Sequence, residues 1–126
     1  MTVPTDPKIL TRRCDIDVSS SEYLLVKPDD DDTIAIATAG DFVLGALTND
    51  VADGSSTAVY VPVQVGGIIK VKVAETMDAG RLATSNGTGS AVIADSTADY
   101  FFGVALEDHT SGDIGAFLYA PGGQIN

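Results

Sequence analysis

The chain contains one histidine, His109, and one cysteine, Cys14, the residue types that most often supply a base or a thiolate nucleophile near neutral pH. His109 lies in an acidic stretch, and no Gly-x-Ser-x-Gly motif of a hydrolase accompanies it. Cys14 follows Arg13, which favours a thiolate, but Asp15 comes next and opposes it. One cysteine and one histidine also cannot form an internal disulfide or a zinc site of the usual kind. We therefore expect no enzyme activity, no catalytic residue and no cofactor.

Two acidic stretches are the remaining candidates for metal binding. Neighbouring carboxylates in the run Asp29–Asp32 point in alternate directions, which favours a solvated loop, with a calcium or magnesium site as the alternative. The stretch Asn49–Gly54 begins like an EF-hand loop. However, Val51 stands where a third ligand is needed, and Tyr60 stands where the last glutamate belongs. We expect no metal site in this chain.

The charge and the remaining short motifs exclude further classes of partner. Eighteen acidic and 7 basic residues give a net charge of -11, which repels phosphate backbones and argues against nucleic-acid binding. No apolar run is long enough for a transmembrane helix, so we expect no membrane contact. Asn86-Gly-Thr88 matches a glycosylation sequon, but the first 21 residues have no signal-peptide layout, so a turn is the better interpretation.

The elements that carry these side chains are predicted to be β-strands. Val, Ile and Thr together number 34 and Leu and Met only 10, and β-branched residues favour strands. Polar and apolar residues alternate strictly from Ile69 to Val73, so Lys70 and Lys72 are expected to point outward. The sequence therefore predicts an all-β, mostly antiparallel fold. We expect a small β-sandwich or barrel-like (β-tulip-like) domain.

Further strands are predicted in short apolar runs. These runs are Thr33–Ala37, Phe42–Leu47, Thr57–Val65, Tyr100–Leu106 and Ile114–Tyr119, with a short strand beginning at Leu82. Pro62 suggests an edge strand or a bulge, because proline cannot donate a ladder hydrogen bond. Gly66-Gly67 is expected to form a hairpin turn to the strand that begins at Ile69.

The sequence also repeats weakly at a shift of 58 residues. Asp41–Gly45 aligns with Asp99–Gly103, and both have the form Asp-aromatic-x-x-Gly. We predict a single β-rich domain over residues 23–126 with repeat units at 34–61 and 92–119. Two such units packed face to face would give a sandwich with pseudo-twofold character. Chance similarity between β-rich segments is the alternative.

Residues 1–22 differ from the rest of the chain and are predicted to form an extended N-terminal arm. They contain three of the seven basic residues, and Pro4 and Pro7 disfavour a helix. The candidate contacts with a partner protein or another subunit are Lys8, Ile9, Leu10, Arg12 and Arg13. The apolar pair would anchor the arm and the basic residues would supply charge contacts. A frayed terminus is the alternative.

Four stretches carry a family resemblance. They are Val65–Val73, Met77–Leu82, Tyr100–Asp108 and Ser111–Leu118. The Gly-Gly-hydrophobic-Lys-Val strand, the Gly-Val-Ala-Leu-Glu-Asp sequence and the Gly-Asp reversal that follows it are similar in outline to one family. This family is the capsid decoration proteins of tailed bacteriophages, also called cement or head-stabilising proteins. The resemblance covers about residues 33–120 and does not extend to the arm.

The resemblance implies a homotrimer that binds the major capsid protein on the outside of a phage head. Such trimers lie at local threefold positions and stabilise the shell, without direct contact to nucleic acid or membrane. The protein would be made in the host cytoplasm and reside on the outer capsid surface of the virion. The alternative is a soluble β-sandwich binding module, for example a glycan-binding module of a tail or fibre. The lack of Trp makes a poor platform for stacking on sugars.

Overall fold

The computed structural model describes residues 8–14, 21–29, 33–48, 59–95 and 99–124. Within these ranges the chain forms two antiparallel five-stranded sheets, which confirms the predicted all-β, sandwich-like fold. The strands are β1 (Lys8–Cys14), β2 (Leu25–Pro28), β3 (Ile34–Ile36), β4 (Gly45–Leu47), β5 (Val59–Gly66), β6 (Ile68–Lys72), β7 (Leu82–Ser85), β8 (Ala91–Ile93), β9 (Tyr100–Ala105) and β10 (Ile114–Gln124). No helix that could cross a membrane occurs in these ranges.

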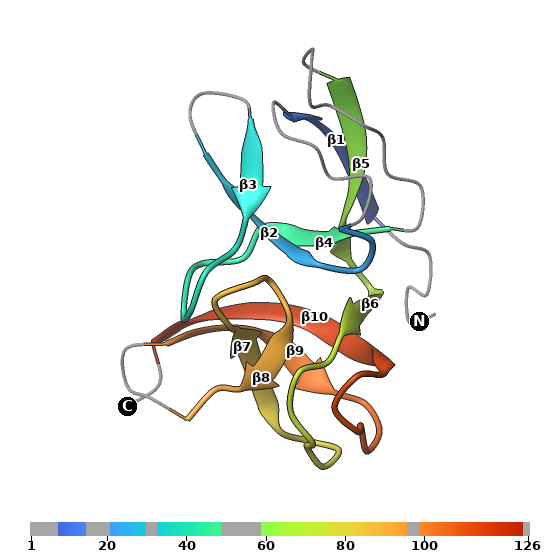
Figure 1. Ribbon diagram of the computed structural model, residues 1–126, viewed down its shortest axis with the longest axis vertical. Helices are drawn as coiled ribbons and strands as arrows, with labels where there is room; N and C mark the ends of the chain where they lie inside the picture. Colours follow the sequence, from blue (N-terminus) through green and yellow to red (C-terminus); the bar gives the residue numbers. More distant parts are fainter. Residues whose placement is uncertain (1–7, 15–20, 30–32, 49–58, 96–98, 125–126) are drawn as a thin grey trace, which may run out of the picture.

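The two sheets have the same connectivity. The first sheet has the strand order β1-β5-β4-β2-β3 and lies above the second, β6-β10-β9-β7-β8, in Figure 1. Adding five to each strand number of the first sheet gives the strand order of the second sheet. Each sheet curls until its outer strands approach at one parallel bridge, between Arg13 and Thr33 and between Val73 and Ala91. Neither sheet closes into a barrel.

The ladder registers relate the two halves residue by residue. Gly45 in β4 and Gly103 in β9 occupy the same place, at the 58-residue shift seen in the sequence. Val63 in β5 and Phe117 in β10 also correspond, but they are 54 positions apart. The similar five-stranded units therefore extend beyond the repeat found in the sequence and differ in the lengths of their connections. The domain limits remain a prediction.

The glycine at the end of each Asp-aromatic-x-x-Gly motif permits a close approach between strands. A Cβ atom at Gly45 would lie 2.3 Å from the Gln64 carbonyl oxygen, and one at Gly103 would lie 2.2 Å from the Leu118 carbonyl oxygen. Ordinary contacts of a Cβ atom begin at 3.4 Å. Both oxygens belong to the long final strand of their half, β5 or β10. The motif therefore marks the closest approach of β4 and β9 to these strands.

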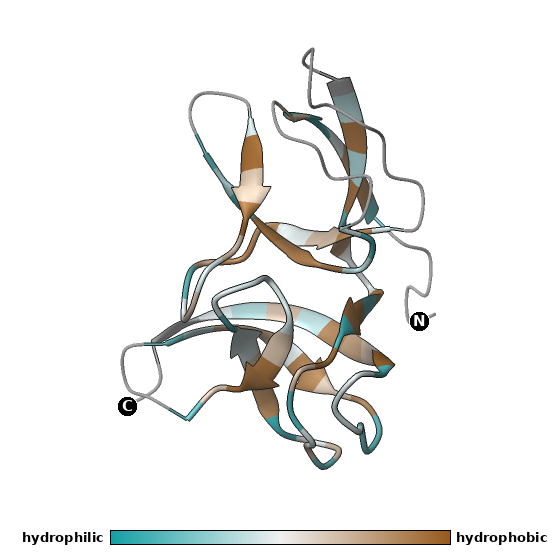
Figure 2. Ribbon diagram, viewed as in Figure 1, coloured by the Kyte–Doolittle hydropathy of each residue, from teal (hydrophilic) through white to brown (hydrophobic). Residues whose placement is uncertain are grey.

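Two clusters of buried side chains form the core. The larger cluster joins both halves and contains Leu25, Ala37, Val43, Ala46, Ile69, Val71, Val73, Met77, Ala83, Ala91, Phe102, Ala105 and Phe117. The Phe102 and Phe117 rings are fully buried with centroids 5.2 Å apart, and burying each contributes about 1.5–3 kcal/mol. The smaller cluster lies in the first half around Cys14, Val61 and Val63. Hydrophobic and hydrophilic residues alternate along β5, as one buried face requires (Figure 2).

The predicted hairpin at Gly66-Gly67 is wrong. β5 and β6 belong to different sheets, and the positive φ of 72° at Gly67 turns the chain from one sheet to the other. Both sides of β5 are occupied by β1 and β4, so β5 has no free edge for β6. For the same reason β5 is not the edge strand that Pro62 suggested. Its ladder with β1 is irregular between Lys8 and Ile9 instead.

The N-terminal segment is more integrated than the predicted arm. Lys8–Cys14 is extended, but it pairs antiparallel with β5 along its whole length. Cys14 is fully buried because its side chain joins the core of the first half. The described part of this segment is therefore an outer strand of the first sheet. Residues 1–7 and 15–20 lie outside the described ranges.

Polar contacts tie the two halves together at their junction. The Tyr119 hydroxyl lies 2.6 Å from the Leu44 carbonyl oxygen, to which it donates, and 3.1 Å from that of Val43. Burial raises the pKa of the Tyr119 hydroxyl, which keeps it in the neutral, donating form. The Tyr100 N–H donates to the Gly40 carbonyl oxygen at 3.1 Å. These bonds connect the second sheet to the loop that precedes β4.

Candidate interaction surface

The contact residues predicted from the sequence all lie in β1, where they occupy different environments. Lys8, Ile9 and Leu10 are exposed, whereas Arg12 and Arg13 are half-buried. Ile9 lies opposite Gln64, and Leu10 lies opposite the buried Val63. Because successive side chains of a strand point to opposite faces, Ile9 projects from the outer face and Leu10 from the core side. Whether any of the five contacts a partner remains a prediction.

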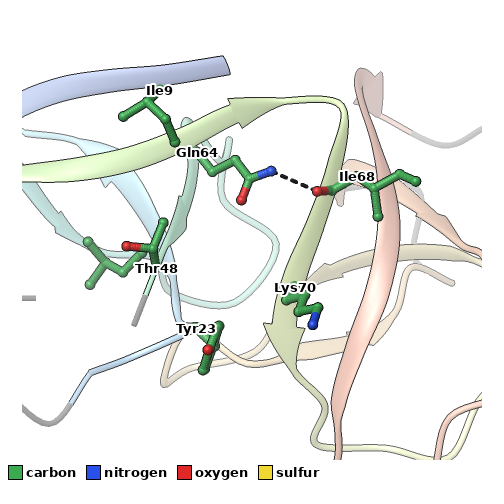
Figure 3. A pocket seen from close by; sticks show the side chains of 7 residues that line it. Ile9, Tyr23, Thr48, Gln64, Ile68 and Lys70 are labelled. Carbon is green, nitrogen blue, oxygen red and sulfur yellow. Dashed lines mark hydrogen bonds between the residues drawn. The ribbon is translucent and has the colours of Figure 1, made fainter. Parts of the chain in front are cut away.

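Ile9 lines a groove of about 310 Å³ at the junction of the two halves. The other lining residues are Tyr23, Leu47, Thr48, Gln64, Ile68 and Lys70 (Figure 3). The exposed fractions of Ile9 and Ile68 are 49% and 45%, so the groove presents two large apolar side chains to solvent. Lys70 adds one positive charge. The groove therefore joins the outer face of the first sheet to β6 of the second.

The edge of β6 forms one wall of this groove. The Gln64 side-chain amide donates to the Ile68 carbonyl oxygen at 2.7 Å (Figure 3). The Lys72 N–H donates to the Tyr23 carbonyl oxygen at 2.9 Å. Alternate residues of an outer strand direct their main-chain groups toward the sheet and away from it. The N–H and C=O groups of Lys70 therefore point outward at this edge, between the hydrogen bonds made there by Ile68 and Lys72.

Tyr23 is held in an unfavourable backbone conformation at the groove. Its φ of 63° is the one positive value of a non-glycine residue in the described ranges. Its counterpart in the second half is Gly80, with a φ of 89°. The Tyr23 N–H donates to the carbonyl oxygen of Leu47, the last residue of β4, and the Gly80 N–H donates to that of Ala105, the last residue of β9. A side chain in this conformation costs about 1–2 kcal/mol. The Tyr23 side chain itself lines the groove.

Sequence reasoning identified only part of this surface. It placed Ile9 among the contacts and directed Lys70 outward, and both are exposed as expected. It missed Tyr23, Gln64 and Ile68. Ile68 lies two positions before the outward Lys70 and therefore on the same face of the strand. An apolar residue at an outward position was the signal in the sequence that could have identified it.

A separate charged contact fixes the loop before β4. Asp41 accepts hydrogen bonds from the Thr38 hydroxyl and, at 3.0 Å, from the Thr38 N–H and the Lys27 ammonium group. The Thr38 hydroxyl is the main reason that the pKa of Asp41 lies below its ordinary value, and Lys27 adds to the effect. Lys27 is therefore engaged within the chain, unlike the exposed Lys70 of the groove.

The two residues with catalytic side-chain types lie apart in the core. Cys14 is fully buried in the first half, and His109 is 4% exposed in the second. The His109 ring lies 4.9 Å from the Phe117 ring, and its Nε2 atom is 3.1 Å from the Ala116 carbonyl oxygen. A Cβ atom at Gly115 would lie 2.6 Å from this imidazole. In the structure both residues pack the core. No group of three His, Cys, Asp or Glu side chains suited to a metal ion occurs in the described ranges.

The predicted turn at Asn86 lies within the described ranges. The Asn86 Oδ1 atom accepts the N–H groups of Thr88 at 2.9 Å and Ser90 at 3.0 Å, so the predicted turn between β7 and β8 is confirmed. Residues 30–32 of the aspartate run and the stretch Asn49–Gly54 lie outside the described ranges.

The fold defines an all-β protein built from two similarly connected five-stranded sheets. No protein-family model and no curated protein match its sequence. Among solved structures it is similar to the head fiber gp8.5 N base of bacteriophage phi29, with a TM-score of 0.70. The similarity covers 96% of this chain and 99% of that chain, at 20% sequence identity. The two proteins therefore share a fold over almost their whole lengths.

Proposed function

We propose that this chain is a structural protein of a bacteriophage head, without enzyme activity. In this proposal it binds the major capsid protein on the outer surface of the virion, as a homotrimer at local threefold positions, and stabilises the shell. The observation that carries the proposal is the shared fold with the base of a phage head fiber over 96% of the chain. The independent resemblance of residues 33–120 to capsid decoration proteins points to the same place in the virion.

The physical properties of the chain suit this role. A protein that binds only the assembled lattice stabilises that lattice by linkage. Three copies held together engage three sites at once, so weak individual contacts gain avidity. The net charge of -11 favours solubility of crowded particles and disfavours direct contact with packaged DNA.

The surface that we assign to the capsid protein is β1 together with the groove. It combines the exposed Lys8 with the apolar Ile9 and Ile68, and Lys70 supplies a second positive charge. An exposed apolar surface rimmed by charge is typical of protein contact sites. The positive φ of Tyr23 adds a strained backbone at the same place.

Sedimentation with phage heads tests the proposal. Purified protein is mixed with heads that lack it, from the phage whose genome encodes the chain, and the heads are pelleted. We expect the protein to pellet with the heads, to saturate at a fixed ratio to the capsid protein and to raise the temperature at which the heads open. Protein that stays in the supernatant at all concentrations would refute the proposal.

A matched pair of variants tests the assigned surface. Ile9→Glu places a charge in the groove and is expected to weaken binding to heads at least about tenfold. Thr88→Glu places the same charge in the exposed turn between β7 and β8 and should bind like the wild type. Deleting residues 1–21 is not a suitable test, because it removes β1 and the buried Cys14.

A further inference from the structure

The outer face of the second sheet is a second apolar surface, which adjoins the assigned capsid contact and shares Ile68 and Lys70 with it. Its residues are Ile68, Lys70 and Lys72 of β6, Ile114, Ala116 and Leu118 of β10, Val104 of β9, Leu82 of β7 and Leu106 directly after β9. The ladder pairs Ile68 with Leu118, Leu118 with Val104, and Val104 with Leu82. Cross-strand partners share a face, so one apolar row crosses four strands.

This face remains open to solvent although its residues are large and apolar. The exposed fractions are 45% for Ile68, 45% for Ile114, 44% for Leu118 and 44% for Leu106. The opposite face of the same strands is closed by Phe117 and Val71, which are fully buried. Contiguous apolar surface of this kind marks an interaction site in soluble proteins.

The charges on this half of the molecule are sorted between strands and loops. The strands β6 to β10 contain no Asp or Glu, and their only charged residues are Lys70 and Lys72 of the outer strand β6. The connection from β9 to β10 carries the exposed carboxylates of Glu107, Asp108 and Asp113. One half of the chain thus presents an apolar face with a positive edge and, beside it, an acidic loop.

We infer that this face is the contact between copies of this chain. A partner suited to it must offer apolar surface with carboxylates at the rim, and a second copy offers both. The positive β6 edge of one copy would meet the acidic loop of the next. A contact of this kind, between unlike parts of identical subunits, generates a ring when the rotation between neighbours closes. This inference rests on the proposed function for the number of copies, which is three.

Light scattering after size-exclusion chromatography tests the inference on the full chain. We expect the wild type to self-associate and Leu118→Glu, at the centre of the face, to shift the equilibrium to monomers by about 30-fold or more. Ile114→Glu is a second variant at another exposed position, and circular dichroism shows whether each variant is folded. Tyr60→Glu, in the first sheet at 66% exposure, is the matched control and should associate like the wild type.

The charge contacts have their own readout. Lys70→Glu combined with Lys72→Glu should weaken self-association, and raising the salt concentration should weaken the wild type but not this variant. A wild type that is monomeric at all concentrations, or one that self-associates unchanged by Leu118→Glu and Ile114→Glu, would overturn the inference. Head binding is measured separately. Monomers that still pellet with heads would refute the inferred self-contact but not binding to the head. Oligomers that do not pellet with heads would refute only the proposed function.

Discussion

Alanine at the two equivalent glycines should separate strands that lie unusually close. In Gly103→Ala the new Cβ would stand 2.2 Å from the Leu118 carbonyl oxygen, and in Gly45→Ala 2.3 Å from that of Gln64. Both oxygens are main-chain atoms, so no flexible side chain can move aside. Ordinary contact begins at 3.4 Å, so the strands must part by about 1 Å. The neighbouring ladder hydrogen bonds would then exceed the usual limit of about 3.2 Å.

The expected loss of stability follows from that displacement. Two weakened main-chain hydrogen bonds cost about 1 kcal/mol each, and the disturbed packing adds a similar amount, which gives about 2–3 kcal/mol per variant. For a domain of this size the melting temperature should fall by about 8–12 °C. Because the two glycines lie in different sheets, the two losses should be nearly additive in the double variant.

Urea titration followed by circular dichroism measures these losses. Gly87→Ala is the matched control, because a Cβ there meets no atom within 4 Å, and its midpoint should equal or slightly exceed that of the wild type. Midpoints of Gly45→Ala and Gly103→Ala that match this control would contradict the close approach and the equivalence of the two halves.

Three further substitutions test contacts of the core and the junction. Tyr119→Phe removes a hydroxyl bonded across the junction and should lower the free energy of unfolding by about 1–1.5 kcal/mol in urea, whereas an unchanged midpoint would argue against that bond. Gly115→Ala should lower the free energy of unfolding by about 1–2 kcal/mol, because the new methyl group displaces the buried His109 ring. The chain has no Trp, so its near-ultraviolet circular dichroism comes from Tyr and Phe, and a spectrum identical to that of the wild type would contradict this displacement. The Thr38 hydroxyl is the main cause of the lowered pKa of Asp41. The ionised carboxylate therefore stabilises the fold at pH values above its ordinary pKa of 3.8, and this stability is lost as the pH falls through the lower pKa of the folded state. The loss of unfolding free energy in Asp41→Asn should accordingly be smaller at about pH 3 than at about pH 6.

Residue types and alternation were sufficient for the fold class. The excess of β-branched residues predicted strands, and the alternation from Ile69 to Val73 placed Lys70 and Lys72 outside, as the structure has them. The strands β2 and β8 have only 4 and 3 residues, which is too short for a periodic signal. Their positions depend on pairing with β4 and β7, which local sequence does not encode.

Sheet assignment and the candidate surface depend on long-range contacts. Gly66-Gly67 looks like a hairpin turn, and only the occupation of both sides of β5 sends the chain into a second sheet. The groove brings Ile9, Tyr23 and Ile68 together from three separate segments. None of these segments alone indicates a binding site, because the groove forms only where the two halves pack together.

Cryo-electron microscopy of intact heads is the decisive experiment for the proposed position of this protein on the shell. The heads would come from the phage that encodes the chain. We expect density for two stacked five-stranded sheets on the outer surface of the shell, in three copies around local threefold positions, with β1 and the groove against the capsid protein. A shell with no such density, or density for this fold only inside the head or on the tail, would contradict it.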